Sequence, residues 1–106
     1  MTDKIVVFST ASGVEEAEKI ARGLVDQRLA ACVNIVPAVR SFYRWQGKIE
    51  DSAEILLVIK SSRERFEALS TALEKLHSYE VPEVIAMPVV DGARNYLNWM
   101  DGELGV

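Results

Sequence analysis

The sequence has only one cysteine, one histidine and three prolines in 106 residues. A single cysteine excludes an internal disulfide framework. No apolar run approaches the roughly 20 residues that a membrane-spanning helix needs, and the N-terminus lacks the basic segment and apolar stretch of a signal peptide. These absences favour a protein of the reducing cytoplasm that has no membrane partner.

An excess of positive charge is also missing. The chain carries 12 basic and 16 acidic residues, which gives a net charge of −4. Because binding to nucleic acid depends on clustered Lys and Arg, we expect no nucleic-acid partner. With 49% hydrophobic and 26% charged residues, residues 1–106 have the composition of a single domain with one core.

The first and third quarters of the chain carry strand and helix patterns. A β-branched apolar run predicts a strand over residues 4–10. Apolar residues at helical spacing predict helices over about 13–30 and over 62–76, with capping-box patterns that begin at Ser12 and at Ser61. Gly23 inside the first helix is predicted to allow a close approach to the sheet.

The middle of the chain predicts a long β-hairpin. A strand begins at Cys32, and Pro37 indicates an edge position or a bulge, because proline cannot donate to a ladder. Gln46-Gly47 predicts a turn between residues 40–45 and 48–50, and residues 54–60 form an apolar run typical of a central strand. A hairpin arm spanning residues 41–60 follows from this pattern.

The stretch from His77 to Pro88 marks a change from helix to strand. Pro82 has no amide hydrogen and disfavours helical geometry at Val81, so the chain leaves the second helix extended before a strand over 84–87. A last short helix follows Gly92. The resulting order, βαββαβ and then α, predicts an α+β ferredoxin-like sandwich with an extra C-terminal helix.

Large apolar side chains are predicted on both faces of this sheet. Two helices can cover only one face, so the other face needs a partner, and self-association is the simplest answer. The exposed aromatics would supply anchors of this interface, although they could also form a ligand-stacking cage. These residues are Tyr43, Trp45, Tyr96 and Trp99.

The same segments resemble a known family. Residues 30–35, the run Tyr43-Arg44-Trp45-Gln46-Gly47-Lys48-Ile49-Glu50, residues 54–60, Tyr-Glu-Val-Pro-Glu at 79–83 and Tyr-Leu-Asn-Trp at 96–99 are similar, in order and spacing, to the CutA family of divalent-cation tolerance proteins. The resemblance implies a ferredoxin-like subunit, an intertwined homotrimer and an association with copper or other divalent ions. It also implies an architectural kinship with the trimeric PII signalling proteins, which bind small ligands between subunits.

The resemblance also points to positions for metal ligands. Copper-linked family members carry a cysteine in the first strand and one or two histidines before the Tyr-Glu-Val-Pro segment, where this chain has Ser9, Leu76 and His77. Imidazole suits copper far better than a hydroxyl or a leucine. We therefore expect weak Cu(II) binding, mainly through His77, with minor contacts from Cys32, Glu50, Glu80 and Glu83.

Each of these residues also has a structural interpretation. His77 can be a helix-end histidine held near the last carbonyls by the helix dipole, and Cys32 can be a small core residue. Glu50, Glu54, Glu80 and Glu83 form either a hard-oxygen cation site or solvated carboxylates that pair with Lys48, Lys60 and Arg44. The segment 9–13 either binds an anion at a helix start or caps the helix.

Two functions remain from the sequence. The first is divalent-cation (copper) tolerance by a non-enzymatic homotrimer, since no nucleophile motif accompanies the single histidine and no organic cofactor is indicated. The alternative is a PII-like trimeric sensor or scaffold that binds a small metabolite or a partner protein between subunits. A copper titration and a thermal-shift screen against metabolites distinguish them.

Overall fold

The fold is built on an antiparallel sheet. The computed structural model describes residues 1–105. In chain order its elements are β1 (Lys4–Ala11), α1 (Val14–Asp26), β2 (Cys32–Trp45), β3 (Lys48–Ser62), the 3-10 turn η1 (Arg63–Arg65), α2 (Phe66–Leu76), β4 (Ile85–Pro88) and α3 (Arg94–Leu104). The strands pair in the order β2-β3-β1-β4. This topology confirms the predicted ferredoxin-like fold with an added C-terminal helix.

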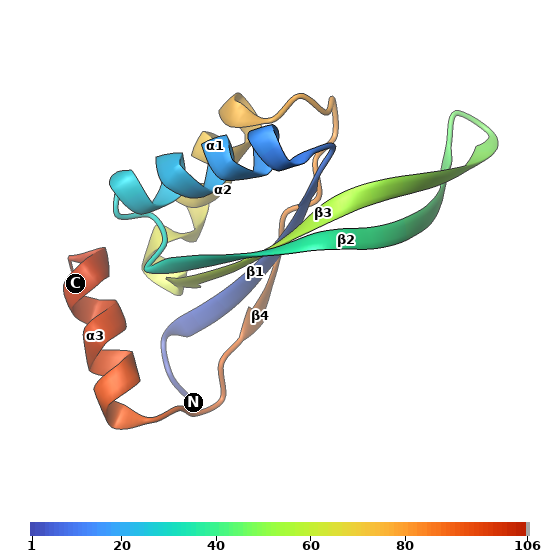
Figure 1. Ribbon diagram of the computed structural model, residues 1–106. Coiled ribbons are helices and arrows are strands. Elements are labelled where there is room, and N and C mark those ends of the chain that lie inside the picture. The colour runs from blue at the N-terminus through green and yellow to red at the C-terminus, as the bar shows by residue number, and fades with distance from the viewer. Residues whose placement is uncertain (106) are drawn as a thin grey trace.

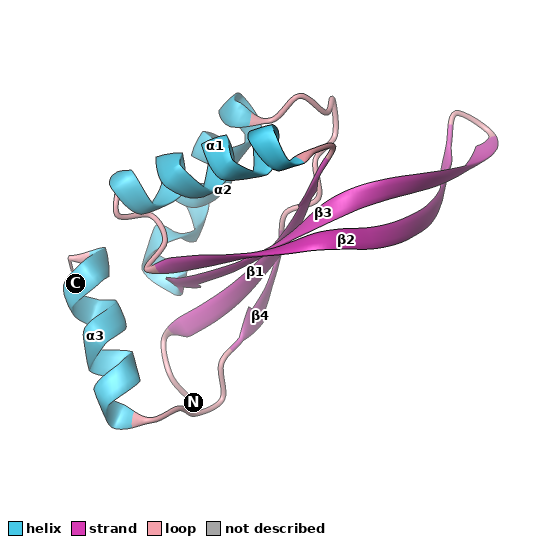
Figure 2. Cartoon of the chain, viewed as in Figure 1, coloured by secondary structure: helices cyan, strands magenta, loops and turns pink. Residues whose placement is uncertain are grey.

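The main core lies between the sheet and two helices. α1 and α2 run over one face of the sheet (Figure 1; Figure 2). Because side chains alternate across a strand, Val7 and Ala11 of β1 point into this layer and are fully buried with Ile20, Leu24 and Leu69 of the helices. Central β1 and the two helices therefore fix the positions of the chain segments around them.

The opposite face of the sheet is also apolar. Phe8 of β1 pairs with Val58 of β3, and Thr10 pairs with Leu56, on the face away from the main core. These side chains are only half-buried. The prediction of apolar groups on both faces is thus confirmed, and this second face is available to a partner.

The hairpin of β2 and β3 projects beyond the sheet as a two-stranded arm (Figure 1). Residues 39–45 pair with residues 48–54, whereas β1 pairs with β3 only as far as Ile55. Gln46 and Gly47 at the tip both have positive φ, 51° and 81°, as the predicted tight turn requires. A register shift between Val36 and Val39 flanks Pro37, which confirms the predicted bulge.

Several predicted element boundaries are wrong. α1 ends at Asp26, before residue 30, because Arg28 turns into a left-handed conformation with φ 58°. The N-cap of α1 is Gly13, without a side-chain cap; Ser12 instead bonds Glu16, one residue beyond the predicted box. The segments 48–50 and 54–60 belong to one continuous strand, β3.

The second helix and the glycine of the first also differ from expectation. β3 runs to Ser62, and α2 begins only at Phe66 after a 3-10 turn whose N-cap has no side-chain hydrogen bond. Gly23 approaches α2 rather than the sheet, because a Cβ there would lie 2.9 Å from Leu76 Cδ1. Gly23 thus lets the two helices pack closely.

α3 stands apart from the other helices, near the start of β2 (Figure 1). Met100 and Leu104 form a second small core with Ala31. The buried Lys4 ammonium contacts Asp101 at 2.6 Å, which ties α3 to β1. Across residues 1–105, every helix is too short or too polar to cross a bilayer.

Candidate functional site

His77 lies at the end of α2 with its ring fully buried, at 0% exposure. The Tyr79 backbone N–H donates to Nδ1 at 3.0 Å, so Nδ1 carries no proton. Nε2 then carries the proton and donates to the Thr10 carbonyl oxygen at 2.6 Å. His77 does sit at the helix end, but it bonds a carbonyl of β1 instead of the last helical carbonyls.

Glu16 of α1 lies beside this histidine, with Oε2 3.8 Å from Nδ1 of His77. It accepts hydrogen bonds from the Ser78 amide at 2.7 Å and from the Ser12 amide and hydroxyl at 3.1 and 2.9 Å. Burial acts to raise the pKa of Glu16, but the hydrogen bonds from Ser78 and Ser12 outweigh it and lower the pKa to about 2. Of the two interpretations of segment 9–13, side-chain capping is absent at Gly13, and the free Ser12 amide is bonded by the chain's own Glu16 carboxylate.

Tyr79 links the helix-to-strand junction to the base of the arm. Its hydroxyl donates to Glu54 Oε2 at 2.6 Å, and its ring packs on His77 with centroids 4.6 Å apart. Burial, and then the neighbouring Glu54 carboxylate, raise the pKa of the Tyr79 hydroxyl. The phenol therefore remains a hydrogen-bond donor across the ordinary pH range.

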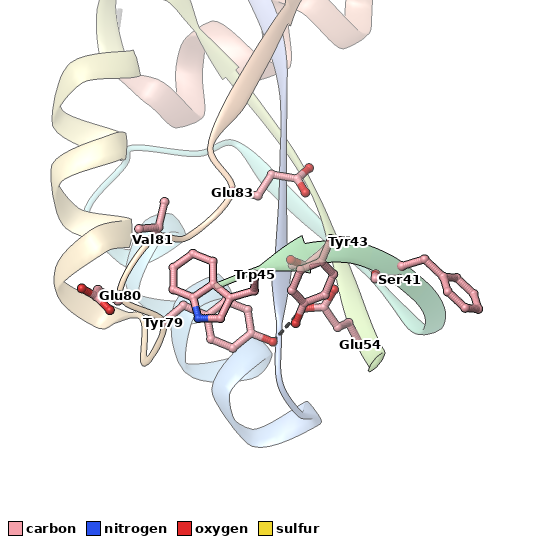
Figure 3. Close-up of a pocket in the computed structure, with 10 residues that line it drawn as sticks. Ser41, Tyr43, Trp45, Glu54, Tyr79, Glu80, Val81 and Glu83 are labelled. Carbon is pink, nitrogen blue, oxygen red and sulfur yellow. Dashed lines mark hydrogen bonds between the residues drawn. The ribbon is translucent and has the colours of Figure 1, made fainter. Parts of the chain in front are cut away.

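A pocket of about 650 Å³ opens where the arm leaves the sheet. Figure 3 shows the rings of Trp45, Tyr43 and Tyr79 gathered near the Glu54 carboxylate, with Glu80 to one side and Glu83 to another. These residues come from β2, β3 and the segment after α2. The junction identified in the sequence and the arm thus share one concave site.

The predicted metal residues are distributed over several places. Glu50 lies in the arm opposite Tyr43, whereas Glu80 and Glu83 line the pocket. Half-buried Cys32 starts β2. Within residues 1–105 no three His, Cys, Asp or Glu side chains converge as a metal-binding group. A metal role for His77 and these residues stays a prediction.

The two other positions that the resemblance singled out are part of the core. Ser9 is fully buried, and its hydroxyl has no hydrogen-bond partner among the residues that the structure describes. Leu76 packs against the main core. The expectation of solvated or paired carboxylates holds for Glu80 and Glu83, which are exposed, but not for buried Glu54. In the part of the chain described, none of the carboxylates pairs with Lys48, Lys60 or Arg44, and Lys60 instead donates to Asn34.

The predicted interface aromatics lie in two separate regions. Tyr43 and Trp45 are exposed on the arm, while Trp99 is exposed on α3, where it packs on Tyr96 with centroids 5.5 Å apart. The sequence offered no signal for the bond between Tyr79 and Glu54, which are 25 residues apart, or for the role of Glu16.

Fold and site together define a ferredoxin-like α+β protein with a projecting hairpin and a polar helix-to-strand junction. The model of the family "CutA1 divalent ion tolerance protein" matches residues 5–103. The chain therefore belongs to the CutA1 family, as the sequence motifs predicted, and its function is of the CutA divalent-cation tolerance type.

Individual relatives agree. The divalent-cation tolerance protein CutA of Thermus thermophilus is 45% identical over 100 residues, 94% of this chain and 97% of the relative. A crystal structure of CutA from Xylella fastidiosa has a TM-score of 0.95 and 46% identity and covers 97% and 99% of the two chains. A protein named "Protein CutA, chloroplastic" from Arabidopsis thaliana is 44% identical over 96 residues, 91% of this chain but 53% of that relative. The chain thus spans about half the length of this plant protein.

Proposed function

We propose that this protein serves divalent-cation tolerance as a non-enzymatic cytoplasmic homotrimer that binds Cu(II) weakly through His77. The observation that carries the proposal is the two-stranded arm. An isolated two-stranded hairpin is marginally stable in water, yet this arm extends the molecule to 44 Å against 25 and 23 Å in the other directions. It also exposes Phe42 and Ile49 at 62% and 69%. Contact with other subunits would bury this surface and support the arm.

Light scattering on the purified protein tests the assembly. A trimer has a mass of about 35 kDa, three times the 11.8 kDa of the chain. Tyr43, Trp45 and Trp99 are the proposed anchors, because large exposed aromatics dominate the energetics of interfaces. A mass of one chain at micromolar concentration would refute the trimer.

The geometry around His77 supports weak copper binding. Both ring nitrogens already bond backbone groups, so a metal ion must break one of these bonds and reach a buried ring. Tight copper sites also combine several nitrogen or sulfur ligands, and the remaining candidates, Cys32, Glu50, Glu80 and Glu83, would add minor contacts.

Calorimetric titration with Cu(II) at pH 7 tests this step. We expect micromolar affinity at best, with most of the heat lost in His77→Ala. Glu67→Gln, on the exposed side of α2, is the matched control and should leave the heat unchanged. Nanomolar affinity that survives His77→Ala would place the metal elsewhere and contradict the proposal.

The non-enzymatic role belongs to the same proposal. The His77 ring is bonded to backbone groups of Thr10 and Tyr79 and to no side-chain nucleophile in residues 1–105.

The pocket of about 650 Å³ favours the second candidate, a PII-like sensor or scaffold that binds a small metabolite or a partner protein between subunits. A thermal-shift screen in which metabolites raise the melting temperature and copper does not would favour this alternative.

A further inference from the structure

We propose that the pocket beside Glu54 binds a small organic cation, an ammonium or guanidinium group carried on an apolar body. Three acidic side chains, Glu54, Glu80 and Glu83, line the pocket, and its described lining contains no lysine or arginine. A cavity of about 650 Å³ falls within the range that binds small organic molecules, roughly 300–1,000 Å³. The charge of the lining selects a positive ligand.

Glu54 is the anchor of this site. It is only 6% exposed, and its one hydrogen bond within residues 1–105 is accepted by Oε2 from the Tyr79 hydroxyl. Its second oxygen, Oε1, accepts no hydrogen bond from that part of the chain. No basic side chain of the described chain lies within 4 Å. Because a buried carboxylate without a counter-ion is unfavourable, a cation in the pocket supplies the missing partner.

The aromatic lining suits the rest of the ligand. Tyr43, Trp45 and Tyr79 surround the carboxylate (Figure 3). Aromatic faces attract ammonium and guanidinium groups and also pack against apolar bodies. A carboxylate at the base of an aromatic-lined pocket therefore selects an organic cation over a neutral molecule of the same shape.

A divalent metal ion fits this pocket poorly. Calcium or magnesium needs several oxygens that converge on one point, at about 2.0–2.6 Å, whereas the carboxylates of residues 1–105 form no such group. The three acids lie at different sides of the aromatic cluster. An extended organic cation can contact them without that convergence.

The inference specifies the ligand of the sensor alternative, on which it rests, and does not depend on copper binding. A negative amine titration would therefore refute this inference without refuting copper binding, and a negative copper titration would not refute this inference. A basic side chain of a second copy, such as Arg44 or Lys48 on its arm, is the other source of the same chemistry. The experiment separates the two sources.

The test is calorimetric titration of the full chain with phenethylamine and agmatine, and with 2-phenylethanol as the neutral match. We expect saturable binding of the amines and none of the alcohol. Glu54→Gln keeps an acceptor for Tyr79 but removes the charge, and should weaken amine binding by about tenfold or more. Glu67→Gln, outside the pocket, should bind as the parent does. If Glu54→Gln does not fold, Glu83→Gln at its exposed position takes its place.

Three results would overturn the proposal. The first is equal binding of amine and alcohol, and the second is unchanged amine affinity in both Glu54→Gln and Glu83→Gln. The third is the absence of amine binding up to millimolar concentration. If this absence accompanies a loss of oligomer mass in Glu54→Gln by light scattering, the cation comes from a second copy of the chain.

Discussion

His77→Ala offers the sharpest test of what this histidine does without metal. The substitution removes two hydrogen bonds to backbone groups, one from the Tyr79 amide and one to the Thr10 carbonyl. Each is worth about 0.5–1.5 kcal/mol. It also empties the space of a ring with 0% exposure, which adds a cavity cost. We expect a loss of about 2–4 kcal/mol in the free energy of unfolding.

Two further substitutions separate the two bonds. The side-chain oxygen of Asn takes the place of Nδ1, so His77→Asn should keep the bond from Tyr79. The longer amide of Gln reaches the position of Nε2, so His77→Gln should keep the bond to Thr10. Each should recover about half of the loss, whereas Lys75→Ala, exposed in the same last turn of α2, should match the parent.

The assay is guanidinium chloride unfolding followed by circular dichroism, in EDTA and at one protein concentration, because the stability of an oligomer depends on concentration. A His77→Ala protein within about 0.5 kcal/mol of the parent would refute the structural role. The hydrogen bonds of His77 also lower its affinity for copper, because a metal ion must break one of them. Every 1.4 kcal/mol that this costs weakens copper binding about tenfold.

Three other substitutions test the remaining contacts. The pKa of Glu16 is lowered from 4.5 to about 2 on folding, so the stability that its carboxylate contributes is complete above pH 4.5 and is lost as the pH falls toward 2. In a series of unfolding measurements at decreasing pH, the difference in stability between the parent and Glu16→Gln should therefore shrink over that window. Lys4→Met should cost about 1 kcal/mol in denaturant unfolding rather than the 3–5 of a broken buried pair, because Asp3 and Asp101 are 60% and 41% exposed and regain water. Trp45→Ala should lower the melting temperature and the oligomer mass together; a lower melting temperature with unchanged mass would contradict its interface role.

Local patterns in the sequence were enough to predict the order of the helices and strands and the turn at the tip of the arm. Gln46-Gly47 can adopt positive φ at both positions, so the turn and the register of the hairpin follow from two residues. Pro37 marked the bulge for a similarly local reason. The ends of helices were harder to predict from the sequence. Ser12 could bond either Glu15 or Glu16, and it bonds Glu16, whose carboxylate also accepts from the distant Ser78 amide.

The sequence showed where in the chain the candidate site lies, but not which distant residues contact it. The helix-to-strand junction at Pro82 showed where a polar group interrupts apolar segments, and His77, Tyr79 and Glu80 do lie there. Their partners come from elsewhere in the chain: Glu54 is 25 residues from Tyr79, and Glu16 is 62 residues from Ser78. No periodicity links such pairs, because their contact depends on how α1 and β3 pack around β1.

Glu54 shows why contacts between distant residues matter for function. In the sequence it is one of several glutamates beside an apolar run, and a solvated carboxylate is the ordinary expectation. In the fold the arm and the junction enclose it, which leaves it 6% exposed with a phenol as its hydrogen-bond partner. Tyr43 and Trp45, which line this pocket, are also among the aromatics proposed for assembly. A partner subunit that packs on the arm would therefore border the pocket, so assembly and ligand binding at Glu54 should influence each other's equilibria.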